Sequence, residues 1–450
     1  MKDRIRIKNE QLGGGVTDNT GISWLFCMNL LMAKLDKYEI DAEEKKILRG
    51  LARQTAFHAN EPIQEQRIRL WKDHLSLKET RPLVFIDPEL AWYEILPHTA
   101  LQCRHDLARV WEYRLRKEIF WQEKIKDDRV CRKEFSVQDV VVFSDFGIPL
   151  KRTGGENGGA YCIEPVIEDY DRDLGRLHFR NPEIDRDRSA RLEGLADEVF
   201  DGILRVVKDN SWWYSAGLTV DLIHLRGFEN FMCDIYEYPD ELKALMSFLR
   251  DDWLHMLDFL EKNSMLSLNN GGEFMGTGGY GWCDDLPSPG FDPAHVRPAD
   301  MWGYGESQES VSISPDSFAE FVLPYQIPIL ERFGLNSYGC CEPLDNRIDL
   351  ITRAVPRLRK VSVSPWSNLR FMAEKLGKNY VYCWKMNPAI LAVKCINEDA
   401  IRREFRETFA FTRAHGCPTE VLMRDVLTLA FKEENAIRWA RIAMEEAEQY

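Results

Sequence analysis

Asn336-Ser337-Tyr338-Gly339-Cys340-Cys341-Glu342-Pro343 is the stretch around which the rest of the chain can be placed. It contains two adjacent cysteines, then a carboxylate and a proline that can begin a helix. Because side chains alternate along a strand, two neighbouring cysteines cannot both face one core. Two sulfur ligands beside an oxygen ligand are typical of a metal site, so we expect Cys340, Cys341 and Glu342 to bind zinc. The alternative is a pair of buried structural thiols.

Short apolar runs lie on both sides of this stretch, and most of them are followed by a helical pattern. Repeated strand-then-helix units are typical of a parallel sheet covered by helices. About eight such units fit a (β/α)8 TIM barrel better than an open doubly wound sheet. No Gly-x-Gly-x-x-Gly follows the first run, which argues against a dinucleotide-binding fold. The strands are expected at 83–87, 140–143, 218–223, 265–270, 299–304, 335–341, 358–364, 380–384 and 420–423.

The N-terminal part of the chain has a helical pattern. Asp41 is expected to cap a helix, with Glu44 at the capping-box position, and a second helix is expected at about 62–75. We therefore divide the chain into an N-terminal helical extension, residues 1–80, and a barrel, residues 81–450.

Composition and charge argue against several classes of function. Hydrophobic residues at 44% and charged residues at 29% are typical of a globular protein. The formal net charge of −14 argues against a nucleic-acid partner and against an anionic membrane. Eleven cysteines without framework spacing, and no secretion signal, indicate a reducing, cytoplasmic environment. The apolar run at 24–32 is too short to span a bilayer, so we expect a buried helix or a homodimer contact.

Polar residues follow nearly every expected strand, and active sites of barrels lie at the C-terminal ends of the strands. Glu306 and Glu309 follow one strand and could complete a metal shell or act as acid–base groups. A catalytic zinc needs three protein ligands and an open position, which the adjacent cysteines and a nearby glutamate supply only in part. The strand ends carry Asp87, Trp92, His224, Arg226, Asn269, Asn270, Glu273, Tyr304, Glu306, Gln308, Glu309, Cys340, Cys341, Glu342, Ser364, Trp366, Lys385, Asn387, Arg424 and Asp425.

Two further motifs resemble those of a known superfamily. Ser314-Pro315-Asp316-Ser317-Phe318-Ala319-Glu320-Phe321 with Pro324, followed by the Cys-Cys-Glu-Pro turn, resembles the uroporphyrinogen decarboxylase superfamily. Lys385-Met386-Asn387-Pro388-Ala389 resembles the same superfamily, and the resemblance covers about residues 80–450. It implies a (β/α)8 barrel with a deep pocket at the barrel mouth.

The superfamily contains cofactor-free porphyrinogen decarboxylases and zinc-dependent methyltransferases that use a corrinoid on a partner protein. The chain is closer to the methyltransferases, because the decarboxylases have an arginine-rich motif where it reads Asp87-Pro88-Glu89-Leu90-Ala91-Trp92. These acidic residues would repel a polycarboxylate. The methyltransferases bind zinc through His-x-Cys and a distant cysteine. Here the matching tripeptide is Tyr338-Gly339-Cys340 or Gly339-Cys340-Cys341, without the histidine, and Cys417 is the matching distant cysteine.

The resemblance implies transfer of a methyl group from a small compound, such as a methoxylated aromatic or a methylamine, to the partner's corrinoid. No Asp-x-His-x-x-Gly corrinoid motif occurs in this chain. Zinc would act as a Lewis acid or bind a thiol acceptor. The acid–base groups would be Glu309, Glu342 and Asp425. The substrate-binding residues would be Trp302, Tyr304, Gln308, Trp366 and Lys385.

Two alternatives to methyl transfer stay open. One is a metal-independent decarboxylase or lyase of a small carboxylic acid, with Lys385 and Arg424 as carboxylate anchors. The other is a non-catalytic barrel that binds a small molecule.

Overall fold

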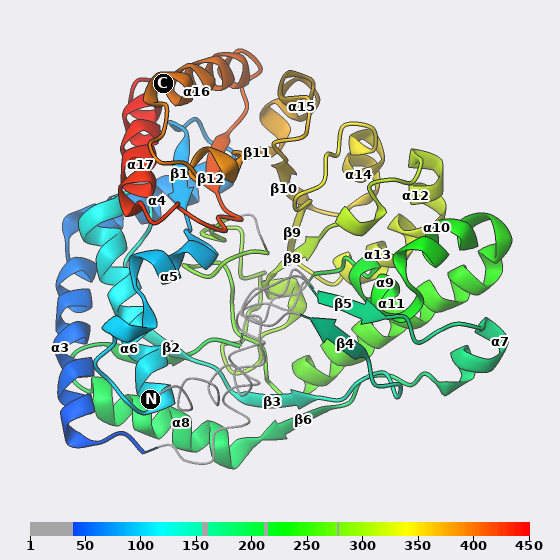
Figure 1. The fold of residues 1–450 in the computed structure, drawn as a ribbon, viewed down its shortest axis with the longest axis horizontal. Coiled ribbons are helices and arrows are strands. Elements are labelled where there is room, and N and C mark those ends of the chain that lie inside the picture. The colour runs from blue at the N-terminus through cyan, green and yellow to red at the C-terminus, as the bar shows by residue number, and fades with distance from the viewer. Residues whose placement is uncertain (1–38, 155–160, 211–214, 277–278) are drawn as a thin grey trace.

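The structure is a computed structural model, and it describes residues 39–154, 161–210, 215–276 and 279–450 (Figure 1). The apolar run at 24–32, with the buried or homodimer-contact helix predicted for it, lies outside the described residues. Within the described part, no helix is both long enough and apolar enough to cross a bilayer.

A six-stranded parallel sheet forms the centre of the molecule, in the order β1-β12-β11-β10-β9-β8. The first strand of the sheet thus pairs with the last strand of the chain. Because all six strands are parallel, their C-terminal ends lie along one edge. The strands are β1 Leu83–Ile86, β8 Trp302–Gly305, β9 Leu335–Tyr338, β10 Leu358–Val363, β11 Val381–Lys385 and β12 Thr419–Met423.

The described hydrogen-bond ladders do not close this sheet into a ring. A second parallel pair, β2 Glu134–Val137 and β7 Arg205–Lys208, forms a sheet of its own. At the open edge formed by β1, side chains of the segment before β2 bind the strand. Asp127 Oδ2 accepts from Ile86 N at 2.9 Å, and Asp128 Oδ2 accepts from Val84 N at 2.8 Å. The architecture is therefore α/β, and it is compatible with the predicted barrel without forming a continuous one.

Helices and two antiparallel pairs surround the parallel strands; α17 lies next to β1, and α16 lies next to α17 (Figure 1). The antiparallel pairs are β3 Val140–Phe143 with β6 Pro182–Asp185, and β4 Lys151–Gly154 with β5 Tyr161–Glu164. The α-helices are α3 Ala42–Ala59, α4 Pro62–Leu75, α5 Trp92–Ile95, α6 Asp106–Phe120, α7 Tyr170–Asp173, α8 Arg186–Phe200, α9 Thr219–Arg226, α10 Phe228–Glu237, α11 Pro239–Lys262, α12 Pro315–Phe321, α13 Leu323–Leu330, α14 Ile348–Ala354, α15 Leu369–Leu376, α16 Glu398–Ala414 and α17 Glu433–Glu448.

The predicted helix signals of the N-terminal part are confirmed. Asp41 caps α3, and its side chain and that of Glu44 form the reciprocal bonds of a capping box. The second helix, α4, covers residues 62–75 as predicted. Buried side chains of α3 pack in one apolar cluster with those of α6 and α8, including Leu48, Leu107 and Leu192.

Three of the predicted strands differ from the structure. Residues 218–223 lie mostly in α9, whose buried Leu222, Leu225 and Arg226 recur with helical spacing. A short apolar run does not distinguish a buried strand from a buried helix. The run at 265–270 is not a strand, because the side chain of Asn269 bonds the backbone of Trp302 in place of a ladder. The run at 140–143 is a strand, but it pairs antiparallel with β6.

A fully buried charge cluster lies in the N-terminal half of the sheet. Lys360 Nζ of β10 is 2.7 Å from Glu420 Oε1 of β12, and both side chains have 0% exposure. His74 of α4, also at 0%, places Nε2 at 3.3 Å from Glu420 Oε2. Burial raises the pKa of Glu420, but Lys360 and His74 outweigh this effect and hold that pKa below its usual range.

Candidate active site

The Cys340-Cys341 turn follows β9 and is fixed through its backbone. Gly339 begins the turn with φ 101°, and a Cβ there would lie 2.8 Å from Leu344 Cδ1 and 3.1 Å from the Cβ of Ser362, so glycine is needed. The Cys340 carbonyl accepts from Ser362 Oγ at 3.0 Å and from Lys385 Nζ at 2.9 Å. Strands β10 and β11 therefore position the turn through their own side chains.

The two thiols lie next to each other at the C-terminal edge of the sheet. Their Sγ atoms are 3.5 Å apart, and Cys341 Sγ donates to Asp425 Oδ2 at 3.4 Å. Cys340 is 7% exposed and Cys341 is half-buried. The hydrogen bond to Cys340, followed by burial, raises the pKa of the Cys341 thiol, so the pair releases its second proton with difficulty.

Glu342 connects the turn after β9 to the loop after β8. Its Oε2 accepts from Cys340 N at 2.8 Å, and its Oε1 accepts from Ser307 N at 2.9 Å. Both carboxylate oxygens thus serve backbone donors, and the residue is 3% exposed. Among the described residues, no group of three or more His, Cys, Asp or Glu side chains is placed to hold a metal ion. The donors predicted to bind zinc do not converge in this arrangement.

Glu306 is buried directly beyond β8. Its carboxylate accepts from Ser215 Oγ at 3.1 Å and from Gln308 N at 3.0 Å. Burial, and then the nearby carboxylates of Glu309 and Glu342, raise the pKa of Glu306 well above its usual range. Glu306 therefore keeps its proton to a higher pH than an ordinary glutamate does.

Glu309 lies one turn further along the same loop. Thr219 Oγ1 donates to Glu309 Oε2 at 2.7 Å, and burial raises the pKa of this carboxyl as well. Gly217, just before α9, faces the Glu306 carboxylate so closely that a Cβ would clash with it. Two acids of one loop are thus held by residues about ninety positions away in the chain, Glu306 by Ser215 and Glu309 by Thr219.

Lys385 and Asp425 complete the group around the thiols. Lys385 ends β11 and is 3% exposed; burial lowers its pKa, but the sulfurs of Cys340 and Cys341 and the Asp425 carboxylate outweigh burial and raise it. Asp425 is exposed and has φ 59°, a strained conformation of the kind found at functional sites. Its backbone N donates to Glu89 Oε2 at 2.9 Å.

The structure brings most of the predicted site residues to this edge. Tyr304 of β8 is 3% exposed and donates through its hydroxyl to Gly339 O at 3.2 Å, so it contacts the turn. Trp366, after β10, is 69% exposed. Trp302 is different: it begins β8 at the opposite edge, and its indole donates to Gly281 O at 2.9 Å inside an apolar cluster. The residues that lie at the C-terminal edge are Tyr304, Gln308, Glu309, Cys340, Cys341, Glu342, Trp366, Lys385 and Asp425.

The sequence analysis did not foresee the contributions of Ser215, Gly217 and Thr219. Ser215 and Gly217 precede α9, and Thr219 begins it within the run at 218–223 that was predicted as a strand; all three reach the site only through tertiary folding. No local pattern in the sequence could have indicated them.

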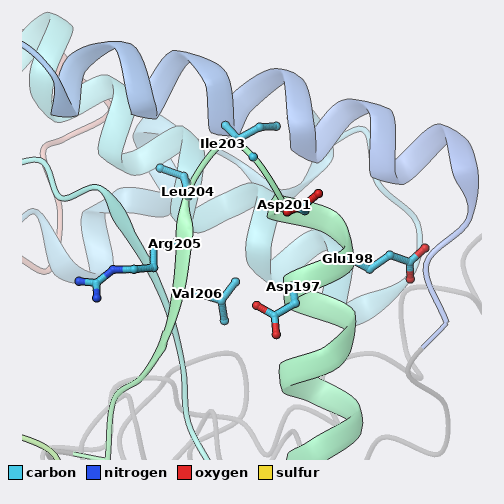
Figure 2. Close-up of a pocket in the computed structure, with 8 residues that line it drawn as sticks. Asp197, Glu198, Asp201, Ile203, Leu204, Arg205 and Val206 are labelled. Carbon is cyan, nitrogen blue, oxygen red and sulfur yellow. The ribbon is translucent and has the colours of Figure 1, made fainter.

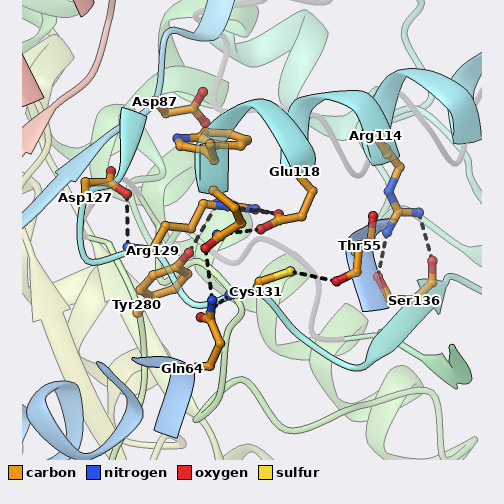
Figure 3. Close-up of polar contacts among 12 residues, drawn as sticks. Thr55, Gln64, Asp87, Arg114, Glu118, Asp127, Arg129, Cys131, Ser136 and Tyr280 are labelled. Atoms are coloured by element: carbon orange, nitrogen blue, oxygen red, sulfur yellow. Dashed lines mark hydrogen bonds and ion pairs between the residues drawn. The ribbon is translucent and has the colours of Figure 1, made fainter. Parts of the chain in front are cut away.

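A second polar network lies close to Asp87, at the end of β1 (Figure 3). Arg129 donates to Glu118 Oε2 through Nε at 3.0 Å and Nη2 at 2.7 Å, and its Nη1 donates to Tyr280 at 3.2 Å. Burial raises the pKa of nearby Asp127 to about 7. The groups of this network bind one another, and their bonds hold the segment that follows the π-helix Trp121–Ile125.

A shallow hollow of about 760 Å³ lies at the junction of α8 and β7 (Figure 2). It is open to solvent and contains none of the predicted site residues. Its lining residues are Asp197, Glu198, Asp201, Gly202, Ile203, Leu204, Arg205 and Val206.

Comparisons with known proteins do not identify a family for this chain. The sequence matches no known family model and no curated protein. Among solved structures, the chain is similar to a methyltransferase from Methanosarcina mazei, with 10% sequence identity and a TM-score of 0.38. That match covers 68% of this chain and 76% of the other. A likeness at this level does not identify the reaction.

Proposed function

We propose that the chain is a methyltransferase that takes a methyl group from a small methylated compound at the C-terminal edge of a (β/α)8 barrel. The methyl acceptor would be a corrinoid carried by a partner protein. The observation that carries this proposal is Glu306, a buried carboxyl that Ser215 Oγ and Gln308 N hold just beyond β8 and whose pKa is raised by burial and by the nearby acids. Removal of a methyl group from oxygen or nitrogen requires a proton donor, and a carboxyl with a raised pKa suits that role better than an ordinary glutamate.

The residues of the chain would act on the leaving group. When the methyl–heteroatom bond breaks, its electron pair stays on the heteroatom, which must be protonated to leave. Glu306 donates that proton and becomes a carboxylate, and Glu309, held by Thr219, can return one to it. The corrinoid, when bound, supplies the nucleophile that takes the methyl group.

The remaining edge residues would position the substrate. Lys385 fixes the thiol turn through the Cys340 carbonyl, and Tyr304 packs beside that turn. Trp366 is exposed enough to cover a bound substrate from the outside. Glu342, whose oxygens serve Cys340 N and Ser307 N, would position the two loops rather than exchange protons.

The proposed reaction has no zinc step. Zinc at Cys340, Cys341 and Glu342 would need Glu342 to leave its two backbone donors, and a further ligand is missing from the described residues. We therefore expect methyl transfer to survive incubation with a strong chelator.

Methyl transfer to free, reduced cobalamin tests the proposal directly. The purified chain is incubated without oxygen with a methoxylated aromatic or a methylamine, and methylation of the corrinoid is followed by absorbance. Glu306→Gln should lower kcat by about 10²- to 10⁴-fold, because it removes the proton donor. Glu407→Gln, on the exposed face of α16, is the matched control and should leave kcat unchanged. An inert wild-type enzyme with all donors, or an unaffected Glu306→Gln variant, would contradict the proposal.

One observation favours a decarboxylase or lyase as the second candidate. Arg424 binds Glu89 through Nε at 2.7 Å, but its buried Nη1 has no hydrogen-bond partner among the described residues. A substrate carboxylate could take that position. Release of CO₂ from a small carboxylic acid, lost in Arg424→Gln, would favour this reaction over methyl transfer.

A further inference from the structure

We propose that Cys340 and Cys341 are a site of reversible oxidation, at which a low-molecular-weight disulfide converts the two thiols into a disulfide between adjacent residues. This inference is independent of the proposed function, because it concerns the thiols themselves and not the substrate.

The geometry of the pair carries the inference. The two sulfurs are 3.5 Å apart, so a disulfide bond of about 2.05 Å needs rotation of the two side chains and a local change of the peptide between them. None of the described cysteines forms a disulfide, and Cys383 and Cys417, with exposures of 0% and 3%, are shielded from reagents. The half-buried Cys341 can be reached from solvent, while Cys340 lies behind it.

The exposure of the two sulfurs sets the order of the exchange. The pair loses its first proton to solvent, and Cys341 Sγ, the more exposed sulfur, attacks one sulfur of the small disulfide as a thiolate. That disulfide bond breaks, and the first small thiolate leaves and takes a proton. Cys340 Sγ then attacks the Cys341 sulfur and expels the second small thiol, which leaves with the Cys340 proton. The protein pair loses two electrons and two protons, and the small disulfide gains both.

Covalent geometry makes the resulting bond easy to reduce. Adjacent Cα atoms across a trans peptide are about 3.8 Å apart. Relaxed disulfides join Cα atoms about 4.4–6.8 Å apart, and deviation from this range stores strain that favours reduction. A disulfide of this kind has the properties of a regulatory bond rather than a structural one.

Closing the ring would change the candidate active site. The peptide between the two cysteines contains the Cys340 carbonyl, which Ser362 and Lys385 hold in place. Ring closure reorients this peptide, so the 2.9 Å contact between Lys385 Nζ and the carbonyl is lost. Oxidation would therefore release Lys385 from the turn.

Mass spectrometry of a tryptic peptide from the treated full-length protein tests the inference. The reduced protein is equilibrated with glutathione at increasing proportions of glutathione disulfide, quenched with acid, alkylated and digested with trypsin. Residues 333–347 form one tryptic peptide in which Cys340 and Cys341 are the two cysteines. We expect this peptide to become two hydrogen atoms lighter, without alkylation, and to recover both thiols after reduction. Alkylation of both cysteines at every glutathione ratio would overturn the inference.

Two single variants test the order of attack. In Cys340→Ser, Cys341 should accumulate as a stable mixed disulfide with glutathione, because the second thiol is missing. In Cys341→Ser, the peptide should stay largely unmodified, since Cys340 is shielded. Equal glutathione adducts in both variants would refute the assigned order. Cys395→Ser, which removes an exposed cysteine elsewhere, is the control and should not alter the peptide at 333–347. These readouts do not use methyl transfer, so failure of one proposal leaves the other intact.

Discussion

Two buried glutamates near the sheet differ in their surroundings. Glu420 lies in the N-terminal half of the sheet, and Glu306 lies just beyond its C-terminal edge. Glu420 faces the ammonium group of Lys360 at 2.7 Å and the imidazole of His74 at 3.3 Å. Glu306 accepts hydrogen bonds from a hydroxyl and a backbone amide, and its charged neighbours include Glu309 and Glu342. Burial raises the pKa of both carboxyls. Lys360 and His74 lower the pKa of Glu420, whereas Glu309 and Glu342 raise the pKa of Glu306 further.

The difference separates a structural charge from a candidate catalytic acid. A paired buried carboxylate fixes two strands and a helix, and it stays ionised. A carboxyl held among other acids keeps its proton to a higher pH, which suits it to act as a proton donor. The opposite ends of one sheet thus serve different purposes, in agreement with the usual position of active sites in parallel α/β folds.

The largest expected effect is the loss of the cation at the paired end. Lys360→Met leaves Glu420 charged and buried without its closest partner, so the free energy of unfolding should fall by about 3–5 kcal/mol. Urea denaturation measures this change. Lys375→Met is the matched control, because Lys375 pairs with Asp349 at 2.8 Å on the surface, and its loss should change stability by about 1 kcal/mol or less. Similar losses in the two variants would show that the buried pair has no special role.

The pH dependence of stability sharpens the comparison at the other end. The pKa of Glu306 is raised on folding, so its stabilising contribution is present below the pKa of the unfolded chain and is lost as the pH rises through the folded value. Glu306→Gln removes the cost of ionising this buried carboxyl, which is about 1.4 kcal/mol for each unit by which folding raises the pKa, so the variant should be more stable than wild type above neutral pH. The gain should disappear towards pH 4.5, the usual value for glutamate. A gain that is constant with pH would point to packing instead.

Glu420 should show the opposite dependence. Its folded pKa is lowered, so its contribution is present above the unfolded value and is lost as the pH falls through the folded value. Glu420→Gln should therefore differ most from wild type at neutral pH and least in acid. Urea denaturation between pH 3 and pH 8 distinguishes this profile from that of Glu306→Gln.

The smallest expected effect concerns the exposed rim of the candidate site. Trp366 is 69% exposed, so Trp366→Ala should change the free energy of unfolding by no more than about 0.5 kcal/mol. If Trp366 contacts the substrate as proposed, KM should rise while kcat stays close to wild type. An unchanged KM would remove Trp366 from the substrate-binding residues.

Local sequence patterns predicted much of the fold. The cap of α3 depends on two residues three positions apart, Asp41 and Glu44, and strands β9 to β12 lie within runs that the sequence predicts as strands. The segments at 218–223 and 265–270 were assigned wrongly because a short apolar run fits either a helix or a strand, and because Asn269 replaces a ladder with side-chain bonds.

The candidate site was only partly predictable. Cys340, Cys341, Lys385 and Asp425 stand at strand ends, where the barrel rule places them. The positions of Ser215 and Gly217 beside Glu306 depend on contacts across about ninety residues, for which a single sequence has no signal. The zinc prediction treated Glu342 as a free ligand, whereas its two oxygens are occupied by backbone amides.

Infrared difference spectroscopy tests the central claim, that Glu306 is a neutral acid at neutral pH while Glu420 is ionised. The spectrum of wild type minus Glu306→Gln at pH 7 should contain the carbonyl band of a protonated carboxyl group. The spectrum of wild type minus Glu420→Gln should contain carboxylate bands instead. Carboxylate bands in the Glu306 difference spectrum would contradict the account, because an ionised Glu306 would have no proton to give to a leaving group.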